Sequence, residues 1–248
     1  MSALGHPRLH LRSTDSTNER ARELAIAGAP HGTLITAAEQ SAGRGRQGRR
    51  WSAPAGSSIL MSLLLRSPPR LLPLMAAVAV CDAAGERAGI KWPNDVVVAL
   101  EHTGAGPGLG KLAGILVEAR PQQGWAVLGI GLNVAVRLED LPPELHPDRM
   151  GANAVSGLPA ATMGLESADV EPTLAALIAS LERRLAESDG AILEAWRARD
   201  ALRGREISWS EGRGLADGID GEGRLVVALP GGGHTALGAG EIHLESIG

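Results

Sequence analysis

The sequence predicts an α+β fold: a mixed β-sheet with helices on one face, followed by a small β-barrel. Up to about residue 200, short apolar runs typical of strands are interspersed with longer runs whose apolar residues have helical spacing. Beyond residue 200, about five strand-like runs are separated by glycine turns such as Asp217-Gly218. Phe and Tyr are absent, so the core must be aliphatic with a few Trp. We therefore expect two domains, a catalytic domain in residues 1–200 and a C-terminal barrel in residues 201–248.

The first predicted helix begins at Ser16. Ser16 is followed three residues later by Glu19, which is the spacing of a capping box, and a helix from this point would end at Gly28. The apolar and β-branched runs at residues 33–38 and 59–65 then predict the first two strands.

Residues 72–88 are almost entirely Ala, Val and Leu, and they predict a buried helix that ends at Gly89. Cys81 lies inside this helix, where a cysteine usually packs as a small apolar side chain. Residues 90–100 then predict a strand that passes through Lys91-Trp92-Pro93-Asn94-Asp95.

A β-hairpin is predicted next, with strands at residues 111–119 and 125–134. The glycine-rich residues 101–110 before it predict a flexible loop, and the proline-rich residues 141–159 after it predict a mobile loop over a site. Two further helices are predicted from apolar residues at helical spacing, at residues 171–188 and 191–199.

The composition limits the class of protein. With 248 residues, 44% hydrophobic and 21% charged, the chain has the composition of an ordinary soluble globular protein. Its net charge of −4 argues against nonspecific DNA binding, and its single cysteine rules out an intrachain disulfide. No histidine pair has the spacing of a zinc site. Neither a signal peptide nor an apolar run of about twenty residues is found, so we expect a cytoplasmic protein with no membrane partner.

The most informative stretch is residues 43–51, which hold four arginines, three glycines and Trp51. Glycine lets the backbone approach a ligand closely, and the arginine guanidinium donates a fork of hydrogen bonds to carboxylate or phosphate. The combination favours binding of a small polyanion. The loop alone leaves open a solvated basic loop with no ligand.

Other stretches give this loop a family context. The sequence contains, in order, Asp15-Ser16-Thr17-Asn18, residues 40–51, Lys91-Trp92-Pro93-Asn94-Asp95, Gly110-Lys111-Leu112-Ala113-Gly114-Ile115-Leu116 and Gly129-Ile130-Gly131-Leu132-Asn133. In this order they resemble the biotin protein ligases, or biotin–[acetyl-CoA-carboxylase] ligases. The resemblance covers nearly the whole chain and implies the class II synthetase-like catalytic fold of biotin and lipoate ligases, with an SH3-like C-terminal barrel. It is to the monofunctional type that lacks an N-terminal DNA-binding domain.

The resemblance implies a two-step reaction that uses ATP and Mg²⁺. The carboxylate of biotin attacks the α-phosphate of ATP to give biotinyl-5′-AMP and diphosphate, and a lysine of a biotin carboxyl carrier protein domain then displaces AMP. The first step brings an anion to a polyanion, and two unit charges ~4 Å apart repel by about 1 kcal/mol even in water. Fixed cations can offset that repulsion. The implied partners are biotin, ATP and the carrier domain. DNA is not expected as a partner, and the protein is expected to be a monomer or a homodimer.

The resemblance also carries roles onto individual residues. Catalytic roles are expected for Lys91 and Arg46. The biotin site is expected to contain Ser16, Thr17, Asn18, Gln40, Gly43, Arg44, Gly45, Arg46, Lys91, Gly114, Gly129 and Gly131. The nucleotide site is expected to contain Arg46, Arg49, Trp51, Asn94, Lys111 and Asn133. No side chain is expected to ligate a metal, because no carboxylate pair marks a site and the ATP phosphates can supply most of the coordination.

Other interpretations are open. Ser16 can serve as a helix cap only, Lys111 as a charge at a strand end, and Trp51 as a packing residue. A lipoate or octanoate ligase or transferase of the same superfamily is an alternative function. A non-enzymatic biotin sensor or nucleic-acid-binding module is another, which the negative charge and the lack of Phe and Tyr disfavour. Residues 105–112 do not form a P-loop, because Ala105 and Leu112 replace a required glycine and hydroxyl residue.

Overall fold

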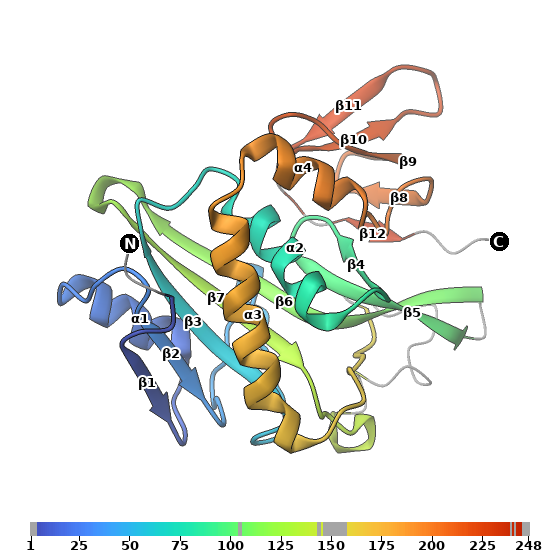
Figure 1. The fold of residues 1–248 in the computed structure, drawn as a ribbon. Coiled ribbons are helices and arrows are strands. Elements are labelled where there is room, and N and C mark those ends of the chain that lie inside the picture. The colour runs from blue at the N-terminus through green and yellow to red at the C-terminus, as the bar shows by residue number, and fades with distance from the viewer. Residues whose placement is uncertain are drawn as a thin grey trace.

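The computed structural model describes residues 4–103, 106–142, 145, 158–238, 240 and 242–244. In this part of the chain a seven-stranded sheet, a five-stranded sheet and four α-helices are present (Figure 1). None of these helices is long and apolar enough to cross a membrane.

The larger sheet has the strand order β1-β2-β3-β7-β6-β5-β4. Strands β1 and β2 are parallel, and every other neighbouring pair is antiparallel, so the predicted mixed sheet is confirmed. Its strands are β1 (Arg8–Leu11), β2 (Leu34–Ala37), β3 (Ser58–Arg66), β4 (Ala88–Lys91), β5 (Asp95–Thr103), β6 (Gly106–Arg120) and β7 (Trp125–Asn133).

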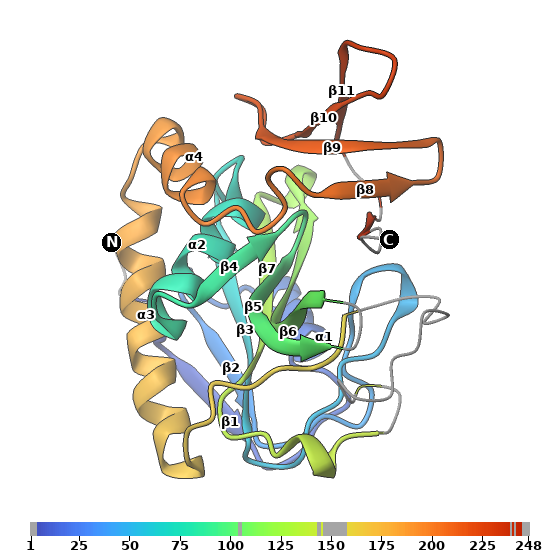
Figure 2. The same ribbon diagram turned by 90° about the vertical axis from the view of Figure 1, so that its right-hand side faces the viewer.

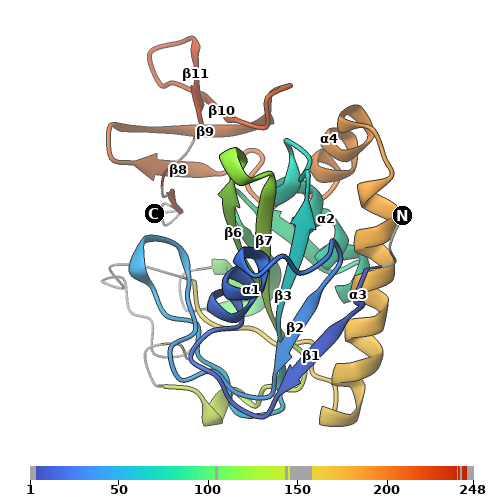
Figure 3. The same cartoon turned by 90° about the vertical axis from the view of Figure 1, so that its left-hand side faces the viewer.

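The helices are α1 (Thr17–Ile26), α2 (Leu72–Ala84), α3 (Val170–Leu185) and α4 (Asp189–Arg197). They cover both faces of the sheet, whereas one covered face was predicted. Because side chains alternate along a strand, Leu63 and Leu65 of β3 join the main core with α2 and α3, and Leu64 packs with Ala21 and Ala25 of α1. Figure 3 shows α1 and α3 on opposite sides of the sheet.

The C-terminal sheet has the order β11-β10-β9-β8-β12, and all of its neighbours are antiparallel. Its strands are β8 (Glu206–Trp209), β9 (Gly212–Ile219), β10 (Leu225–Ala228), β11 (His234–Leu237) and β12 (His243–Leu244). The predicted β-sheet after residue 200 is therefore confirmed. Among the described residues β11 and β12 are its two outer strands and do not pair with each other, so a closed barrel is not observed.

Several predicted elements differ in detail. Ser16 does cap α1, but its side chain makes no capping hydrogen bond, and the predicted capping box is wrong because Glu19 pairs with Arg22 and Arg44 instead. Helix α2 ends before Gly85, not at Gly89.

The segment Lys91-Trp92-Pro93-Asn94-Asp95 joins two strands and does not lie inside one. Strands β4 and β5 form a hairpin, with Lys91 opposite Asp95. Pro93 has no backbone N–H and cannot take part in a strand ladder, which explains a turn here. The loop predicted at residues 101–110 is also wrong in part, since β5 extends to Thr103 and β6 begins at Gly106. Most of the loop predicted at residues 141–159 lies outside the described residues.

The C-terminal part of the chain contacts the larger sheet at three consecutive residues, Ile90, Lys91 and Trp92. Figure 2 shows the C-terminal sheet beside the larger sheet. The backbone of Ile90 exchanges hydrogen bonds with Arg199 and Ala201, at 2.7 and 2.9 Å. Lys91 Nζ and Trp92 Nε1 donate to the carbonyls of Ile242 and Gly223, each at 3.2 Å. The C-terminal sheet is thereby fixed beside the β4–β5 turn. The division into domains at residue 200 stays a prediction.

Candidate active site

A cavity opens on the face of the larger sheet that carries the N-terminus of α1. It is lined by every predicted site residue except Gly43. The other lining residues include Met61, Asp95, Ile115, Leu116, Leu141, Leu145, Leu158, Ala160, Gly240 and Ile242.

One end of the cavity is built from neutral hydrogen-bonding groups. Thr17 and Asn18 are buried at the first turn of α1. The backbone N–H of Thr17, which has no partner within the helix, donates to Gln40 Oε1 at 2.7 Å. Asn18 Nδ2 donates to Glu118 Oε2 at 2.8 Å. This end is suited to an uncharged polar group.

The wall beside it is bare backbone. A Cβ atom added to Gly129 would lie 2.1 Å from Asn18 Oδ1, and one added to Gly131 would lie 2.5 Å from Trp51 Cε2. Gly114 of β6 pairs with Gly131 and faces the same indole ring. Any side chain at the two β7 positions would displace Asn18 or Trp51, so glycine is required for their close approach to the sheet.

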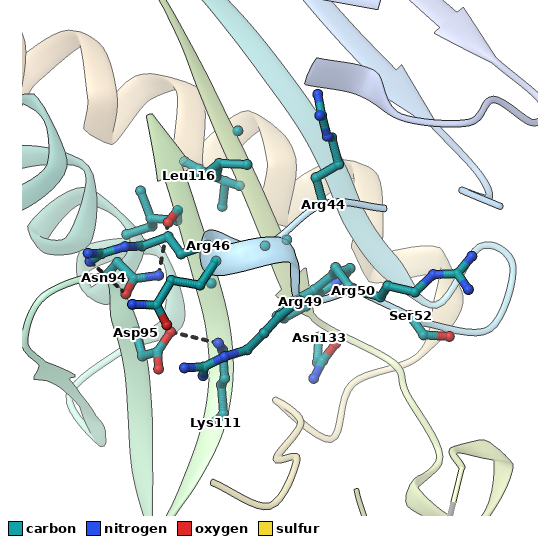
Figure 4. Close-up of a pocket in the computed structure, with 18 of the residues that line it drawn as sticks. Arg44, Arg46, Arg49, Arg50, Ser52, Asn94, Asp95, Lys111, Leu116 and Asn133 are labelled. Carbon is teal, nitrogen blue, oxygen red and sulfur yellow. Dashed lines mark hydrogen bonds and ion pairs between the residues drawn. The ribbon is translucent and has the colours of Figure 1, made fainter. Parts of the chain in front are cut away.

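Residues 43–51 fold back on themselves as a small hairpin. Trp51 N–H donates to the Gly43 carbonyl at 3.0 Å, and Gly45 N–H donates to the Arg49 carbonyl at 2.8 Å. The hairpin sends its arginines in different directions, as Figure 4 shows. Arg46 donates to Asn94 Oδ1 at 3.3 Å, whereas Arg44 pairs with Glu19 at 3.3 Å on the far side of the loop. Only Arg46 of these two is directed at the β4–β5 turn.

The other end of the cavity is strongly cationic. Lys111 Nζ lies 2.6 Å from Asp95 Oδ1, and Lys91, Arg46 and Arg49 lie around the same carboxylate. Burial lowers the pKa of Lys91, Asp95 opposes that shift, and the nearby cations Lys111, Arg49 and Arg46 lower it further. Burial also lowers the pKa of Arg46. Four cations around one carboxylate leave a surplus of positive charge, which a polyanion would neutralise.

The groups predicted for a nucleotide lie next to this cationic end. Asn133 is buried, and its amide is held by Ser58 Oγ at 3.3 Å and the Ala161 carbonyl at 2.9 Å. Trp51 Nε1 is buried and has no hydrogen-bond partner among the described residues. Lys111 Nζ lies 5.8 Å from the centre of the Trp51 ring. The apolar residues Leu141, Leu145, Leu158 and Ala160 complete a wall that a flat ring could contact.

One predicted residue lies elsewhere, and other residues were missed. Gly43 packs under the Trp51 carbonyl and not in the cavity. Residues that contact site residues and were not predicted include Asp95, Ser62 and Ile242. A polar Ser62 within an apolar strand was a usable signal. The sequence carries no signal for the contact between Lys91 and Ile242, because these two positions are far apart in the chain.

Comparison with known proteins identifies relatives. Residues 10–134 match the Biotin/lipoate A/B protein ligase family. The chain is 34% identical to the biotin–[acetyl-CoA-carboxylase] ligase of Paracoccus denitrificans over 90% of this chain and 94% of that protein. The chain is also 39% identical to the bifunctional ligase/repressor BirA of Bacillus spizizenii over 57% of this chain. The match covers only 45% of the length of that relative. A biotin protein ligase from Aquifex aeolicus, in complex with biotin and ATP, superimposes with a TM-score of 0.75 and 25% identity, covering 97% of this chain and 99% of that one.

Proposed function

The chain belongs to the Biotin/lipoate A/B protein ligase family, and we propose that it is an ATP-dependent biotin protein ligase. It would activate biotin as biotinyl-5′-AMP and transfer the biotinyl group to a lysine of a biotin carboxyl carrier protein domain. The ligase name of the Paracoccus denitrificans relative and the biotin and ATP bound to the Aquifex aeolicus structure support this assignment.

One observation carries the proposal: a single cavity has a neutral hydrogen-bonding end and a cationic end. Thr17, Asn18 and Gln40 at the first end suit the uncharged ureido ring of biotin. Lys91, Lys111 and Arg46 at the second end suit the biotin carboxylate and the ATP phosphates. A ligand that spans the cavity would therefore have its two reactive anions brought together among the cations.

The cations explain how the first step becomes possible. A carboxylate oxygen of biotin forms a bond to the α-phosphorus, and the bond from that phosphorus to the diphosphate oxygen breaks. The negative charge that builds up on the phosphoryl oxygens is stabilised by ammonium and guanidinium groups that are already in place. The attacking group belongs to the substrate, so no side-chain nucleophile is required.

The second step requires that the mixed anhydride survive until the carrier lysine arrives. The amine nitrogen then attacks the acyl carbon, the acyl–phosphate bond breaks, AMP leaves and the nitrogen loses a proton. The side chain of Arg46 extends from the loop to Asn94 and is directed at the cationic end of the cavity. We assign to Arg46 the retention of the adenylate phosphate, which keeps the anhydride away from water.

Magnesium enters this proposal only with ATP. The described residues contain no group of three or more His, Cys, Asp or Glu that could hold a metal ion. Asp95, the one carboxylate among the lining residues, already pairs with Lys111. The side chains therefore do not fit a protein-bound magnesium ion, and no step here depends on one. The ATP phosphates would supply its coordination.

ATP–diphosphate exchange distinguishes biotin activation from its alternative. Exchange of labelled diphosphate into ATP should depend on biotin and should not be supported by lipoate or octanoate. Exchange that lipoate or octanoate supports and biotin does not would assign the chain to the lipoate branch of the family. No exchange with any of these acids would refute acid activation by this cavity.

A further inference from the structure

Ser62 lies directly behind the neutral end of the cavity. It is in the middle of β3 and is 0% exposed. Its Oγ lies 2.6 Å from Asn18 Oδ1 and 2.9 Å from Thr17 Oγ1. The sheet register places Ser62 opposite Gly129, the glycine that lets Asn18 approach the sheet. Ser62 therefore contacts two of the residues that line this end of the cavity, Thr17 and Asn18.

The positions of the hydrogens in this cluster follow from its one carboxylate. A carboxylate only accepts, so the Asn18 atom 2.8 Å from Glu118 is the amide nitrogen and Asn18 Oδ1 must face Ser62. The amide oxygen also only accepts, so the hydroxyl of Ser62 donates its single proton to Asn18. The single proton of the Thr17 hydroxyl then has two protein acceptors, Ser62 Oγ at 2.9 Å and Gln40 Oε1 at 3.1 Å.

This arrangement fixes what the cavity offers to a ligand. The Thr17 proton is taken up by these protein acceptors, so Thr17 presents an oxygen lone pair to the cavity. Gln40 Oε1 is occupied by the Thr17 backbone N–H at 2.7 Å, so Gln40 presents its NH₂ group. An acceptor beside a donor matches a group that carries an N–H next to a C=O, as a cyclic urea does. A dithiolane ring or an alkyl chain has neither group.

We propose that Ser62 is a positioning residue that sets the specificity of the cavity for a cyclic urea head group. It holds Asn18 in place and, together with Gln40, keeps the Thr17 proton on protein acceptors, so that Thr17 accepts from a ligand N–H. The inference rests on the proposed function, in which biotin supplies that urea. Without the Ser62 hydroxyl, Asn18 Oδ1 loses its donor, and the Thr17 hydroxyl loses one of its two acceptors and retains Gln40. A buried amide oxygen without a partner and a less firmly held hydroxyl both weaken binding of the urea.

Ser58 provides a matched control on the same strand and the same face. Four residues before Ser62, it lies roughly 13 Å away along the strand. It is also buried, and its Oγ donates to Asn133 Oδ1 at 3.3 Å. The amide nitrogen of Asn133 donates to the Ala161 carbonyl at 2.9 Å. Ser58 thus holds the side chain of Asn133 at the nucleotide end of the cavity, as Ser62 holds the side chain of Asn18 at the neutral end.

The test measures binding by isothermal titration calorimetry with three ligands: biotin, biotin methylated on a ureido nitrogen, and a non-hydrolysable ATP analogue. For Ser62→Ala we expect biotin to bind about tenfold more weakly, and the ATP analogue to bind within about twofold of the unmutated protein. The methylated ligand should lose less affinity than biotin, because it lacks a donor for Thr17. Ser58→Ala should weaken the ATP analogue and leave biotin within about twofold.

Ser62→Cys keeps a weak donor in nearly the same volume and should fall between the unmutated protein and Ser62→Ala. If Ser62→Ala does not fold, the biotin affinity of Ser62→Cys tests the inference instead. Unchanged biotin affinity in both variants would overturn the inference, as would an equal loss for biotin and its methylated form. Failure of the unmutated protein to bind biotin would instead overturn the proposed function, and this inference with it.

Discussion

The ammonium group of Lys91 donates a hydrogen bond to the backbone carbonyl of Ile242, 3.2 Å away and 151 positions later in the sequence. Lys91 is only 9% exposed, and both residues line the cavity. The residue that precedes β12 of the C-terminal sheet therefore contributes directly to the cationic end of the candidate site. The neighbouring residue Trp92 makes a parallel contact with Gly223, so the position of the lysine depends on where that sheet lies.

Replacing Lys91 with methionine should abolish most of the adenylation while leaving the fold intact. Methionine fills a similar volume but removes the charge beside the reacting anions. We expect biotin-dependent ATP–diphosphate exchange to fall by about 10²-fold or more, with an unchanged circular dichroism spectrum. Trp92→Phe is the control, because it removes the contact with Gly223 and no charge. Near-normal exchange by Lys91→Met would remove Lys91 from the mechanism.

The adenylation rate should fall on the alkaline side at a pH below the ordinary lysine pKa. Burial lowers the pKa of Lys91 below its usual 10.5, and Lys111, Arg49 and Arg46 act in the same direction, while Asp95 opposes them. As pH rises through the lowered value, the ammonium loses its proton and the site loses one cation. An arginine at this position should move the decline to higher pH. A pH–rate profile of exchange for both proteins checks this.

The same shift predicts the sign of a stability change. Between the lowered pKa of Lys91 in the folded protein and its higher value in the unfolded chain, the unfolded chain binds more protons. The contribution of Lys91 to the free energy of unfolding therefore becomes more favourable as pH rises through this window. In Lys91→Met that contribution should be absent. Urea unfolding at several pH values tests it, and an identical pH dependence in both proteins would contradict it.

Gly129→Ala should disrupt the neutral end of the cavity. The added Cβ would lie 2.1 Å from Asn18 Oδ1, so Asn18 must move away from Ser62 and Glu118. We expect a loss of stability of about 1–3 kcal/mol and biotin binding that is weakened at least about tenfold. Gly221→Ala is the matched control, since nothing lies within 4 Å of its added Cβ. Biotin affinity measured by calorimetry should separate the two variants; equal affinities would refute the close approach.

Arg46→Gly should release biotinyl-AMP prematurely. Arg46 is the loop arginine that reaches Asn94, and its loss would remove a charged contact with the adenylate phosphate. If that contact contributes about 3 kcal/mol, affinity for the intermediate falls by on the order of a hundredfold. The variant should then label an unrelated lysine-rich protein, detected by blotting for biotin. Arg50→Gly is the control, because Arg50 donates to the Ser41 carbonyl and lies away from Asn94. An active Arg46→Gly variant that labels only the carrier would refute the retention role.

The fold was largely predictable from the sequence because its elements have clear local patterns. The apolar run of β3 and the helical spacing of α3 each identify an element without reference to the rest of the chain. Two features depend on tertiary contacts and were not predictable. Helix α1 covers the opposite face because Leu64 faces away from the main core, and α2 ends early because residues 88–91 pair as a strand with β5.

The candidate site was predictable where the family pattern supplied the residues, as for Lys91, Arg46 and Gln40. Their partners were not predictable, because hydrogen bonds such as Lys91 to Ile242 join segments whose proximity is set by the fold. Ser62 shows the intermediate case. Its polar side chain in an apolar strand marks it as unusual, but only the structure shows that it contacts Thr17 and Asn18.

Biotin transfer to a carrier domain tests the central claim most directly. The purified protein is incubated with biotin, ATP, Mg²⁺ and a biotin carboxyl carrier protein domain, and the carrier mass is measured by mass spectrometry. A carrier whose acceptor lysine is replaced by arginine serves as the control. The proposed function predicts one biotinyl group on the intact carrier, dependent on ATP, and none on the control. A folded protein that leaves the carrier unmodified, or that attaches lipoate in place of biotin, would contradict it.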